Sequence, residues 1–146
     1  MGRFQFRMDN ILSLRQKLED KKKQEYGEAN RKLQIEKQKK QKLIDETTFF
    51  SNHLCEKMKD QIVPSEIISY NQYLKVLRRK TVEQDKVVQK AVNNTEKKRE
   101  ELLEAVKQRK MLESLKEKRW IEYKEELNRE EQKIIDEIVS FKSKSR

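Results

Sequence analysis

His53 and Cys55 are the two residues of this chain whose types could support nucleophilic or metal chemistry, and they are its single histidine and single cysteine. A structural zinc site of Cys and His residues needs four ligands, so this pair cannot complete one. Residues i and i+2 of a helix point in different directions, which leaves the imidazole poorly placed to activate the thiol. Two glycines are too few for a phosphate-binding loop. We predict no catalytic, metal-binding or cofactor-binding residue and no cofactor, so the protein is not an enzyme.

Pro64 is the only strong helix breaker in a chain that otherwise favours helix throughout. It disfavours the helical conformation of Val63 and should end a first helix there. Ser65 is expected to cap a second helix, with Glu66 favourably placed in its first turn. Such a short connection is typical of two antiparallel helices joined as a hairpin.

Residues spaced alternately by four and three predict a coiled coil on both sides of Pro64. These seam positions run from Tyr26 to Leu54 and from Tyr70 to Leu112, and several are polar, which lowers stability. We predict an all-α fold of two long helices in an antiparallel coiled-coil hairpin bent near Pro64. It would be a single domain over residues 1–146, with helix 1 about 4–62, a bend at 62–66 and helix 2 about 66–141.

Pairing positions equidistant from Pro64 brings apolar residues together. An upstream apolar stripe (Phe4, Met8, Ile11, Leu14 and Leu18) then meets the second half, with Leu18 near Leu112 and with Phe4 and Met8 near Trp120 and Tyr123. The second helix is the longer one, so residues beyond about Leu127 should have no partner within the chain. They keep an apolar stripe, and an exposed apolar stripe indicates a binding surface. We name Ile134, Ile138 and Phe141 as its candidate contact residues.

The net charge of +10 comes from 36 basic and 26 acidic residues, which alternate along the chain. Basic residues attract phosphates, but the interleaved acids and the aromatic residues at seam positions argue against specific nucleic-acid binding. No stretch approaches the about 18 apolar residues of a membrane span, and no signal peptide is visible. We therefore expect a cytoplasmic protein that presents surfaces to partners.

Four blocks of this chain resemble the flagellar export protein FliJ family. They are Met1-Gly2-Arg3-Phe4-Gln5-Phe6-Arg7-Met8 with Ile11-Leu12-Ser13-Leu14-Arg15, then Tyr70-Asn71-Gln72-Tyr73-Leu74, then Arg99-Glu100-Glu101-Leu102-Leu103-Glu104-Ala105 leading into Lys110-Met111-Leu112-Glu113, and finally Lys133-Ile134-Ile135-Asp136-Glu137. The blocks span the chain in the family's order.

The resemblance implies a non-enzymatic soluble stalk of the flagellar type III export apparatus. Its partners would be the flagellar export ATPase ring, the membrane export gate and export chaperones, and it would lie at the cytoplasmic face of the membrane. The family's gate-contacting patch falls here on Leu43, Phe50, Tyr73, Leu77 and Gln84. The apolar stripe with Ile134, Ile138 and Phe141 is the candidate contact with the ATPase ring.

Three alternatives stay open at this point. The chain could be a generic coiled-coil spacer or homodimeric scaffold, since diluted seams also suit helices that separate and dimerise. It could be a stalk protein of an injectisome-type secretion system, which shares the architecture. A nucleic-acid-binding coiled coil is the third.

Overall fold

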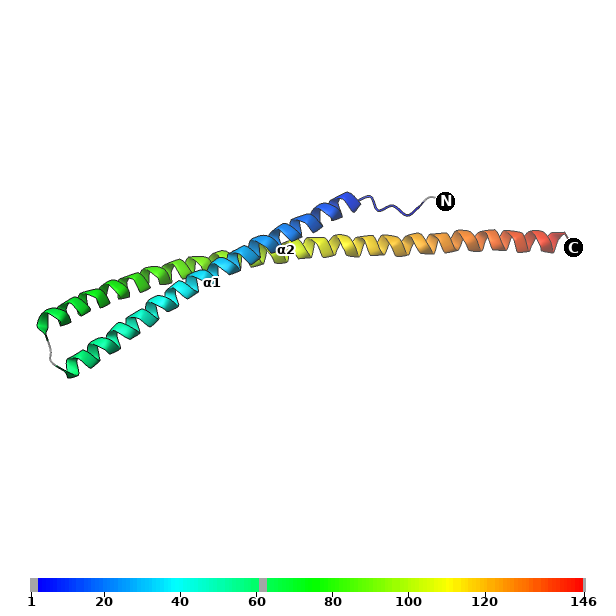
Figure 1. Cartoon of the computed structure of the whole chain (residues 1–146). Coiled ribbons are helices and arrows are strands. Elements are labelled where there is room, and N and C mark those ends of the chain that lie inside the picture. Colours follow the sequence, from blue (N-terminus) through cyan, green and yellow to red (C-terminus); the bar gives the residue numbers. More distant parts are fainter. Residues whose placement is uncertain (1–2, 61–62, 146) are drawn as a thin grey trace. The chain divides into compact units, whose positions relative to one another are not determined.

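Two long α-helices account for most of the part of the chain that the computed structural model describes, residues 3–60 and 63–145. Helix α1 spans Asp9–Lys59 and helix α2 spans Pro64–Lys144 (Figure 1). The predicted all-α fold of two packed helices with a break near Pro64 is confirmed. Contacts group the chain into two units, which we call the bend unit and the terminal unit. The bend unit is Lys22–Leu102, and the terminal unit combines Met1–Lys21 with Leu103–Arg146. A single domain over the whole chain stays a prediction.

Pro64 is the first residue of α2, and the local hydrogen bonds explain its place. The carbonyl of Val63 accepts a hydrogen bond from the N–H of Glu66 at 3.1 Å. Proline has no N–H to leave unpaired at this position, and its fixed φ suits the first helical turn. The prediction that Ser65 caps α2 is wrong, because Ser65 already lies inside the helix. Of the expected bend at 62–66, residue 62 lies outside the described residues.

An extended arm precedes α1, so this helix begins at Asp9 and not near residue 4. In an extended chain Phe4 and Phe6 share one side, whereas a helix would turn them apart. The Phe4 ring lies 5.0 Å from the ring of Trp120 and 5.4 Å from that of Tyr123, measured between centroids. Phe6 is buried. The expected approach of Phe4 to these two aromatic residues is confirmed, and it explains why the arm is extended.

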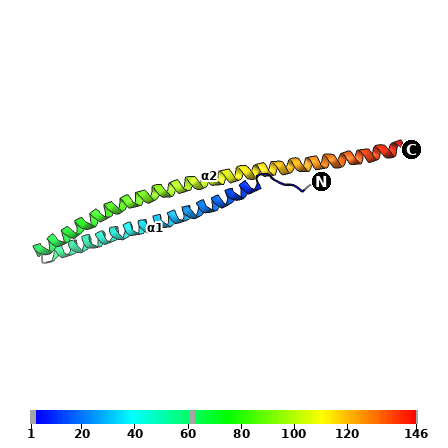
Figure 2. The ribbon, with the colours of Figure 1, turned by 90° about the horizontal axis from the view of Figure 1, so that it is seen from above.

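The predicted seam is the interface between α1 and α2 within the bend unit (Figure 2). Each predicted seam position there is buried or half-buried: Tyr26, Ala29, Leu33, Glu36, Lys40, Leu43, Thr47, Phe50 and Leu54 on α1, and Tyr70, Leu74, Leu77, Thr81, Gln84, Val88, Ala91, Thr95, Lys98 and Leu102 on α2. The two segments run antiparallel, because the sequence separation between paired residues increases with their distance from the bend. Alternating four-and-three spacing therefore identified this interface correctly.

Polar seam residues of the bend unit pair across the two helices. The Gln84 amide donates to the Glu36 carbonyl at 3.0 Å and to its carboxylate at 2.5 Å, and this bond lowers the pKa of Glu36. Lys40 Nζ lies 2.7 Å from the Asp85 carboxylate. No buried side-chain N or O atom among the described residues lacks a hydrogen-bond partner. Such pairs fit only one register, so they favour specificity where apolar residues would favour stability.

A disulfide across the seam would test the hairpin. The Thr95 hydroxyl lies 3.3 Å from the Ala29 carbonyl, so the two backbones approach closely at these small residues. In a Cys55→Ser background, Ala29→Cys with Thr95→Cys should oxidise to a monomeric, cross-linked product at low protein concentration. The control pairs Ala29→Cys with Val82→Cys, since Val82 is 59% exposed and outside the seam. A product that is cross-linked only between molecules would contradict the hairpin and favour a dimer.

The terminal unit does not bury the upstream stripe as the sequence analysis expected. Ile11, Leu14 and Leu18 are 44%, 63% and 37% exposed, while Leu12 and Glu19 are only 6% and 5% exposed. The buried pair continues the four-and-three spacing of the seam toward the N-terminus. The plain helical spacing of apolar residues pointed to the wrong face, because the true interface includes a charged residue.

An ion pair explains why the interface of the terminal unit tolerates Glu19. Arg109 donates through Nε to the Glu19 carboxylate and through an Nη to Glu113 at 2.7 Å. These bonds raise the pKa of Arg109, so the guanidinium stays charged. Arg109 was a predicted seam position, but its partner across the seam was not predicted. This ion pair offsets the desolvation cost of burying the Glu19 carboxylate.

Candidate partner-binding surfaces

Five aromatic rings gather beside the bend, in the bend unit. Phe50 lies 4.7 Å from Tyr73 in an edge-on arrangement and 6.4 Å from Tyr70. His53 stacks on Phe49 at 6.1 Å and meets Tyr70 edge-on at 5.8 Å. Edge-on and stacked pairs of this kind stabilise beyond the area that they bury. We call Phe49, Phe50, His53, Tyr70 and Tyr73 the aromatic cluster.

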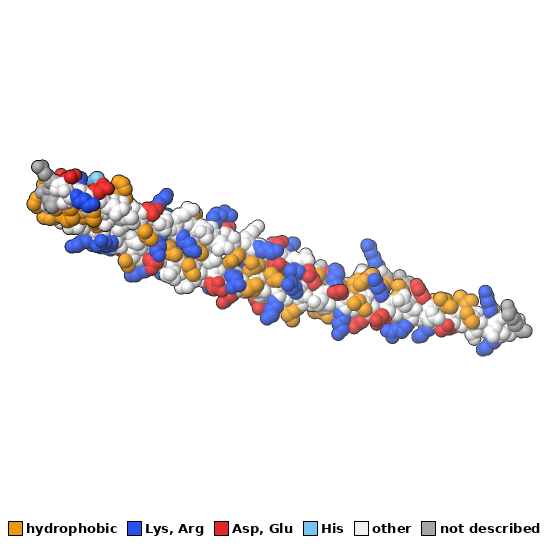
Figure 3. All heavy atoms as spheres, turned by 90° about the horizontal axis from the view of Figure 1, so that it is seen from below, with side chains coloured by type: hydrophobic (Ala, Val, Ile, Leu, Met, Phe, Trp, Pro, Cys, Tyr) orange, Lys and Arg blue, Asp and Glu red, His pale blue; other side chains and the backbone are white. Residues whose placement is uncertain are grey.

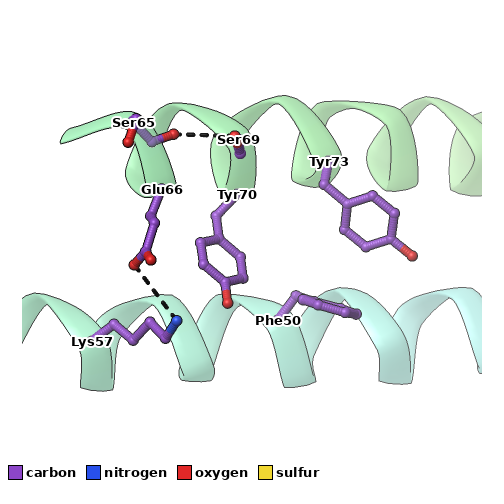
Figure 4. Close-up of a pocket in the computed structure, with 7 residues that line it drawn as sticks. All are labelled: Phe50, Lys57, Ser65, Glu66, Ser69, Tyr70 and Tyr73. Carbon is purple, nitrogen blue, oxygen red and sulfur yellow. Dashed lines mark hydrogen bonds and ion pairs between the residues drawn. The ribbon is translucent and has the colours of Figure 1, made fainter. Parts of the chain in front are cut away.

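A cavity of about 480 Å³ opens beside this cluster (Figure 4). It is lined by Phe50, Lys57, Ser65, Glu66, Ser69, Tyr70 and Tyr73. In Figure 4 the two tyrosines extend from α2 toward α1, and Phe50 and Lys57 extend from α1. Phe49 is 64% exposed and Tyr73 is 39% exposed. The cluster thus combines apolar surface with polar groups at its rim, which is the composition of a protein-binding site.

Hydrogen bonds and charges hold the rim of the cavity in place. The Tyr73 hydroxyl donates to the Glu46 carboxylate at 2.5 Å, which raises the pKa of Tyr73. Lys57 Nζ lies 5.1 Å from the centre of the Tyr70 ring and 3.7 Å from the Glu66 carboxylate. The Tyr70 hydroxyl and then Glu66 raise the pKa of Lys57. The cation therefore stays charged at the mouth of the cavity.

Only two of the five residues carried over as a gate contact meet at this surface. Phe50 and Tyr73 touch in the aromatic cluster. Leu77 is 2% exposed and Gln84 bonds to Glu36, so both are engaged in the helix interface. Leu43 is half-buried in the same seam. The site role of these residues stays a prediction. Sequence reasoning missed Phe49, His53 and Tyr70 as members of the cluster. The available signal was that aromatic residues stand close together in the sequence on both sides of the bend.

The C-terminal part of α2 forms a second exposed apolar surface, in the terminal unit. Every described residue from 128 to 145 is exposed, as expected for the overhang beyond Leu127. Its large apolar side chains are 52–74% exposed: Ile134, Ile135, Ile138, Val139 and Phe141. Figure 3 shows such a group of hydrophobic side chains close to the C-terminal end. We call residues 128–145 the overhang, and its contact role stays a prediction.

The overhang differs from the rest of the chain in charge. The overhang, residues 128–145, contains four acidic and four basic side chains, a net charge of zero, whereas the whole chain carries +10. A helix without net charge attracts phosphates little, and its apolar stripe suits an apolar partner surface. This end of α2 is therefore a poor nucleic-acid contact.

The described residues offer little for catalysis. Cys55 is exposed, and His53 is engaged with aromatic rings. No group of three or more His, Cys, Asp or Glu side chains in residues 3–60 and 63–145 could hold a metal ion. Within the same ranges, no helix is long and apolar enough to cross a membrane. What the described residues provide is exposed apolar surface on an antiparallel two-helix coiled coil.

Comparison with known proteins identifies the family of this coiled coil. The model of the family described as flagellar FliJ protein matches residues 4–146. The chain belongs to the FliJ family, a non-enzymatic, stalk-like coiled-coil component of the type III export apparatus. The resemblance that the sequence showed is thereby confirmed.

A solved structure shares the fold. It is described as the structure of a putative YscO homologue, CT670, from Chlamydia trachomatis. The TM-score is 0.60 with 22% sequence identity, and the match covers 95% of this chain and 94% of that chain. No curated protein sequence matches this chain significantly.

Proposed function

We propose that this protein acts in the flagellar type III export apparatus as a stalk or adaptor between the export ATPase ring, the membrane export gate and export chaperones. Membership of the FliJ family supports the association with the apparatus. The observation that carries the adaptor role is the presence of two separate exposed apolar surfaces, one beside the first turns of α2 and one in its last turns. A protein that joins two partners needs two such surfaces.

The aromatic cluster is the proposed contact with the export gate. Phe50 and Tyr73 belong to it, and it has a cavity that an inserted side chain could fill. Aromatic residues dominate binding energy at protein interfaces because they bury large, rigid surfaces. The overhang is the proposed contact with the ATPase ring, through Ile134, Ile138 and Phe141. The protein would then work at the cytoplasmic face of the membrane, held there by the apparatus.

An injectisome-type system is the second candidate, favoured by the fold of the putative YscO homologue. At 22% identity that likeness concerns the fold alone, whereas the flagellar family model matches nearly the whole chain. We therefore place the protein in the flagellar system.

Binding to the cytosolic domain of the export gate tests the role of the aromatic cluster. Tyr73→Ala should weaken this binding by about tenfold or more, because interface tyrosines often contribute over 1.4 kcal/mol. Titration calorimetry measures the affinity, and circular dichroism checks that helicity is kept. Tyr26→Ala is the matched control, since Tyr26 lies in the seam far along α1 from the cluster. Equal losses for both variants, in proportion to lost helicity, would show that Tyr73 only supports the fold.

A further inference from the structure

One flank of the terminal unit carries apolar side chains that nothing in the described chain covers. On α1, Ile11, Leu14 and Leu18 are spaced by three and four residues and so share a face. On α2, Met111 is 62% exposed and Leu115, four residues later, is half-buried. We call these five residues the apolar flank. Neither the proposed gate contact nor the proposed ATPase contact uses them.

The spacing places the two apolar faces on the same side of the terminal unit. Ile11 and Leu18 each precede a buried residue of α1 by one position, and Met111 and Leu115 each precede a half-buried residue of α2, so in this antiparallel pair both sets lie on one flank. Leu115 and Met8, the residue before α1, line a cavity of about 560 Å³ at one end of this flank. The extended arm forms another wall of this cavity through Phe4 and Phe6. The apolar flank thus continues into a concavity at one end. An isolated exposed apolar residue needs no explanation, but a continuous strip with a cavity does.

The opposite flank of the same interface is closed by ion pairs. Lys116 Nζ lies 2.9 Å from the Asp9 carboxylate, and Arg109 lies 2.7 Å from Glu113. Asp9 and Glu113 lie on the side of the seam away from Ile11 and Leu115, whereas Arg109 and Lys116 lie in the seam itself. A two-helix coiled coil in water is expected to place charged residues on both flanks. Here only one flank follows that rule.

The charged residues three or four positions from the apolar flank are basic. On α1, no residue three or four positions from Ile11, Leu14 or Leu18 is acidic. Four of those neighbours within the terminal unit are basic: Arg7, Arg15, Lys17 and Lys21. Of the three acids of this stretch, Asp9 is bonded to Lys116 and Glu19 to Arg109, and Asp20 is exposed two residues after Leu18.

The α2 side of the flank is basic next to Met111 and Leu115 and acidic one heptad away, at Glu104 and Glu122. Among the residues three or four positions from Met111 and Leu115, Lys107, Lys118 and Arg119 are basic and none is acidic. Glu122 and Glu126 line the cavity together with Arg3, Arg7 and Arg119. An apolar strip edged by cations selects an apolar partner edged by anions.

We propose that the apolar flank docks an amphipathic helix of a partner protein, with an apolar stripe and acidic residues on both edges. Such a helix would pack as a third helix along α1 and α2 and place a side chain in the cavity. Its carboxylates would meet the cations of both helices.

Two other occupants fit the surface less well. A flat anionic membrane would touch the outermost side chains, Leu14 and Met111, but would not reach the half-buried Leu115 or fill a cavity. A second copy carries the same +10 charge and would be repelled. Head-to-tail contact of copies would also be heterologous and open-ended.

A pair of synthetic helical peptides tests the proposal on the full-length protein. Both carry the same leucine stripe, one with glutamate on its edges and the other with lysine. The glutamate peptide should bind about tenfold or more tighter than the lysine peptide, with a gap that narrows at high salt. Leu14→Glu with Met111→Glu should abolish this preference, and Leu103→Glu, at another exposed leucine, should leave it unchanged. Circular dichroism checks that each variant stays helical.

Charge reversal and two further assays make the result decisive. Lys17→Glu with Lys107→Glu should shift the preference toward the lysine peptide. Equal binding of the two peptides by the unchanged protein, or no binding, would overturn the proposal. So would binding to vesicles of anionic phosphatidylglycerol that depends on Leu14 without peptide binding, which would indicate a membrane. A mass in solution that rises with concentration and falls on Leu14→Glu would overturn it in favour of self-association.

Discussion

Leu77→Ala is expected to lower the free energy of unfolding by about 2–5 kcal/mol, the range for removing a well-buried leucine side chain. Leu77 is 2% exposed, and Leu74, three residues before it on the same face of α2, is also buried. A two-helix coiled coil has one thin interface, so neighbouring side chains cannot collapse into the space from a second layer. The loss should therefore fall in the upper part of that range. Denaturant unfolding followed by circular dichroism measures it.

Val82→Ala is the matched control for this substitution. Val82 lies on the same helix and is 59% exposed, so its truncation should change stability by less than about 0.5 kcal/mol. Similar values for the two variants would mean that the seam around Leu77 is not the stabilising interface. Leu77→Ala also distinguishes two roles of Leu77. The resemblance to the family makes it a gate contact, whereas the structure encloses it between α1 and α2. A loss of gate binding in Leu77→Ala should follow the loss of helicity.

The seam could be predicted from the sequence because the coiled-coil period survives polar substitutions. Positions such as Lys40 and Gln84 break the apolar pattern, yet spacing alone placed them at the interface. Their partners, Asp85 and Glu36, could not be predicted, because a one-residue change of register would offer each cation or amide a different acid. Register depends on the sum of many such pairs.

The N-terminal region shows where periodicity misleads. Ile11, Leu14 and Leu18 make a better apolar stripe than Leu12 and Glu19, but the structure buries the latter two. Arg109 on the other helix forms an ion pair with Glu19, and this pair allows the face with Leu12 and Glu19 to be buried. Local sequence cannot reveal a compensating charge 90 residues away. The result is an apolar face left over for a partner.

Only part of the aromatic cluster could be predicted, because its formation also depends on residues from both helices. Phe50 and Tyr73 were predicted as contact residues from the resemblance to the family. Phe49 and His53 were not predicted, and they join the cluster because they lie beside Phe50 at the end of α1, where the interface ends. The cavity depends on the side-chain conformations of residues from both helices. Spacing along one helix does not contain that information.

Removal of the overhang should abolish binding to the export ATPase without destabilising the hairpin. Every described residue after Leu127 is exposed, so truncation there deletes no buried contact and the unfolding midpoint should stay unchanged. Burial of Ile134, Ile138 and Phe141 by a partner would contribute about 1.5–3 kcal/mol each, partly offset by ordering costs. Since about 1.4 kcal/mol corresponds to tenfold in affinity, the loss should exceed a hundredfold.

A point variant separates the apolar stripe from helix length. Ile134→Gln with Ile138→Gln and Phe141→Gln keeps the overhang and should lose ATPase binding as the truncation does. Its control changes exposed polar residues of the same segment, Gln132→Ala with Ser140→Ala, and should bind normally. Titration with the purified ATPase measures affinity, and its rate of ATP hydrolysis reports stimulation. If the truncated chain still binds and stimulates the ATPase like the full chain, the overhang is not the contact, and the extended arm or the flank of the coiled coil must provide it.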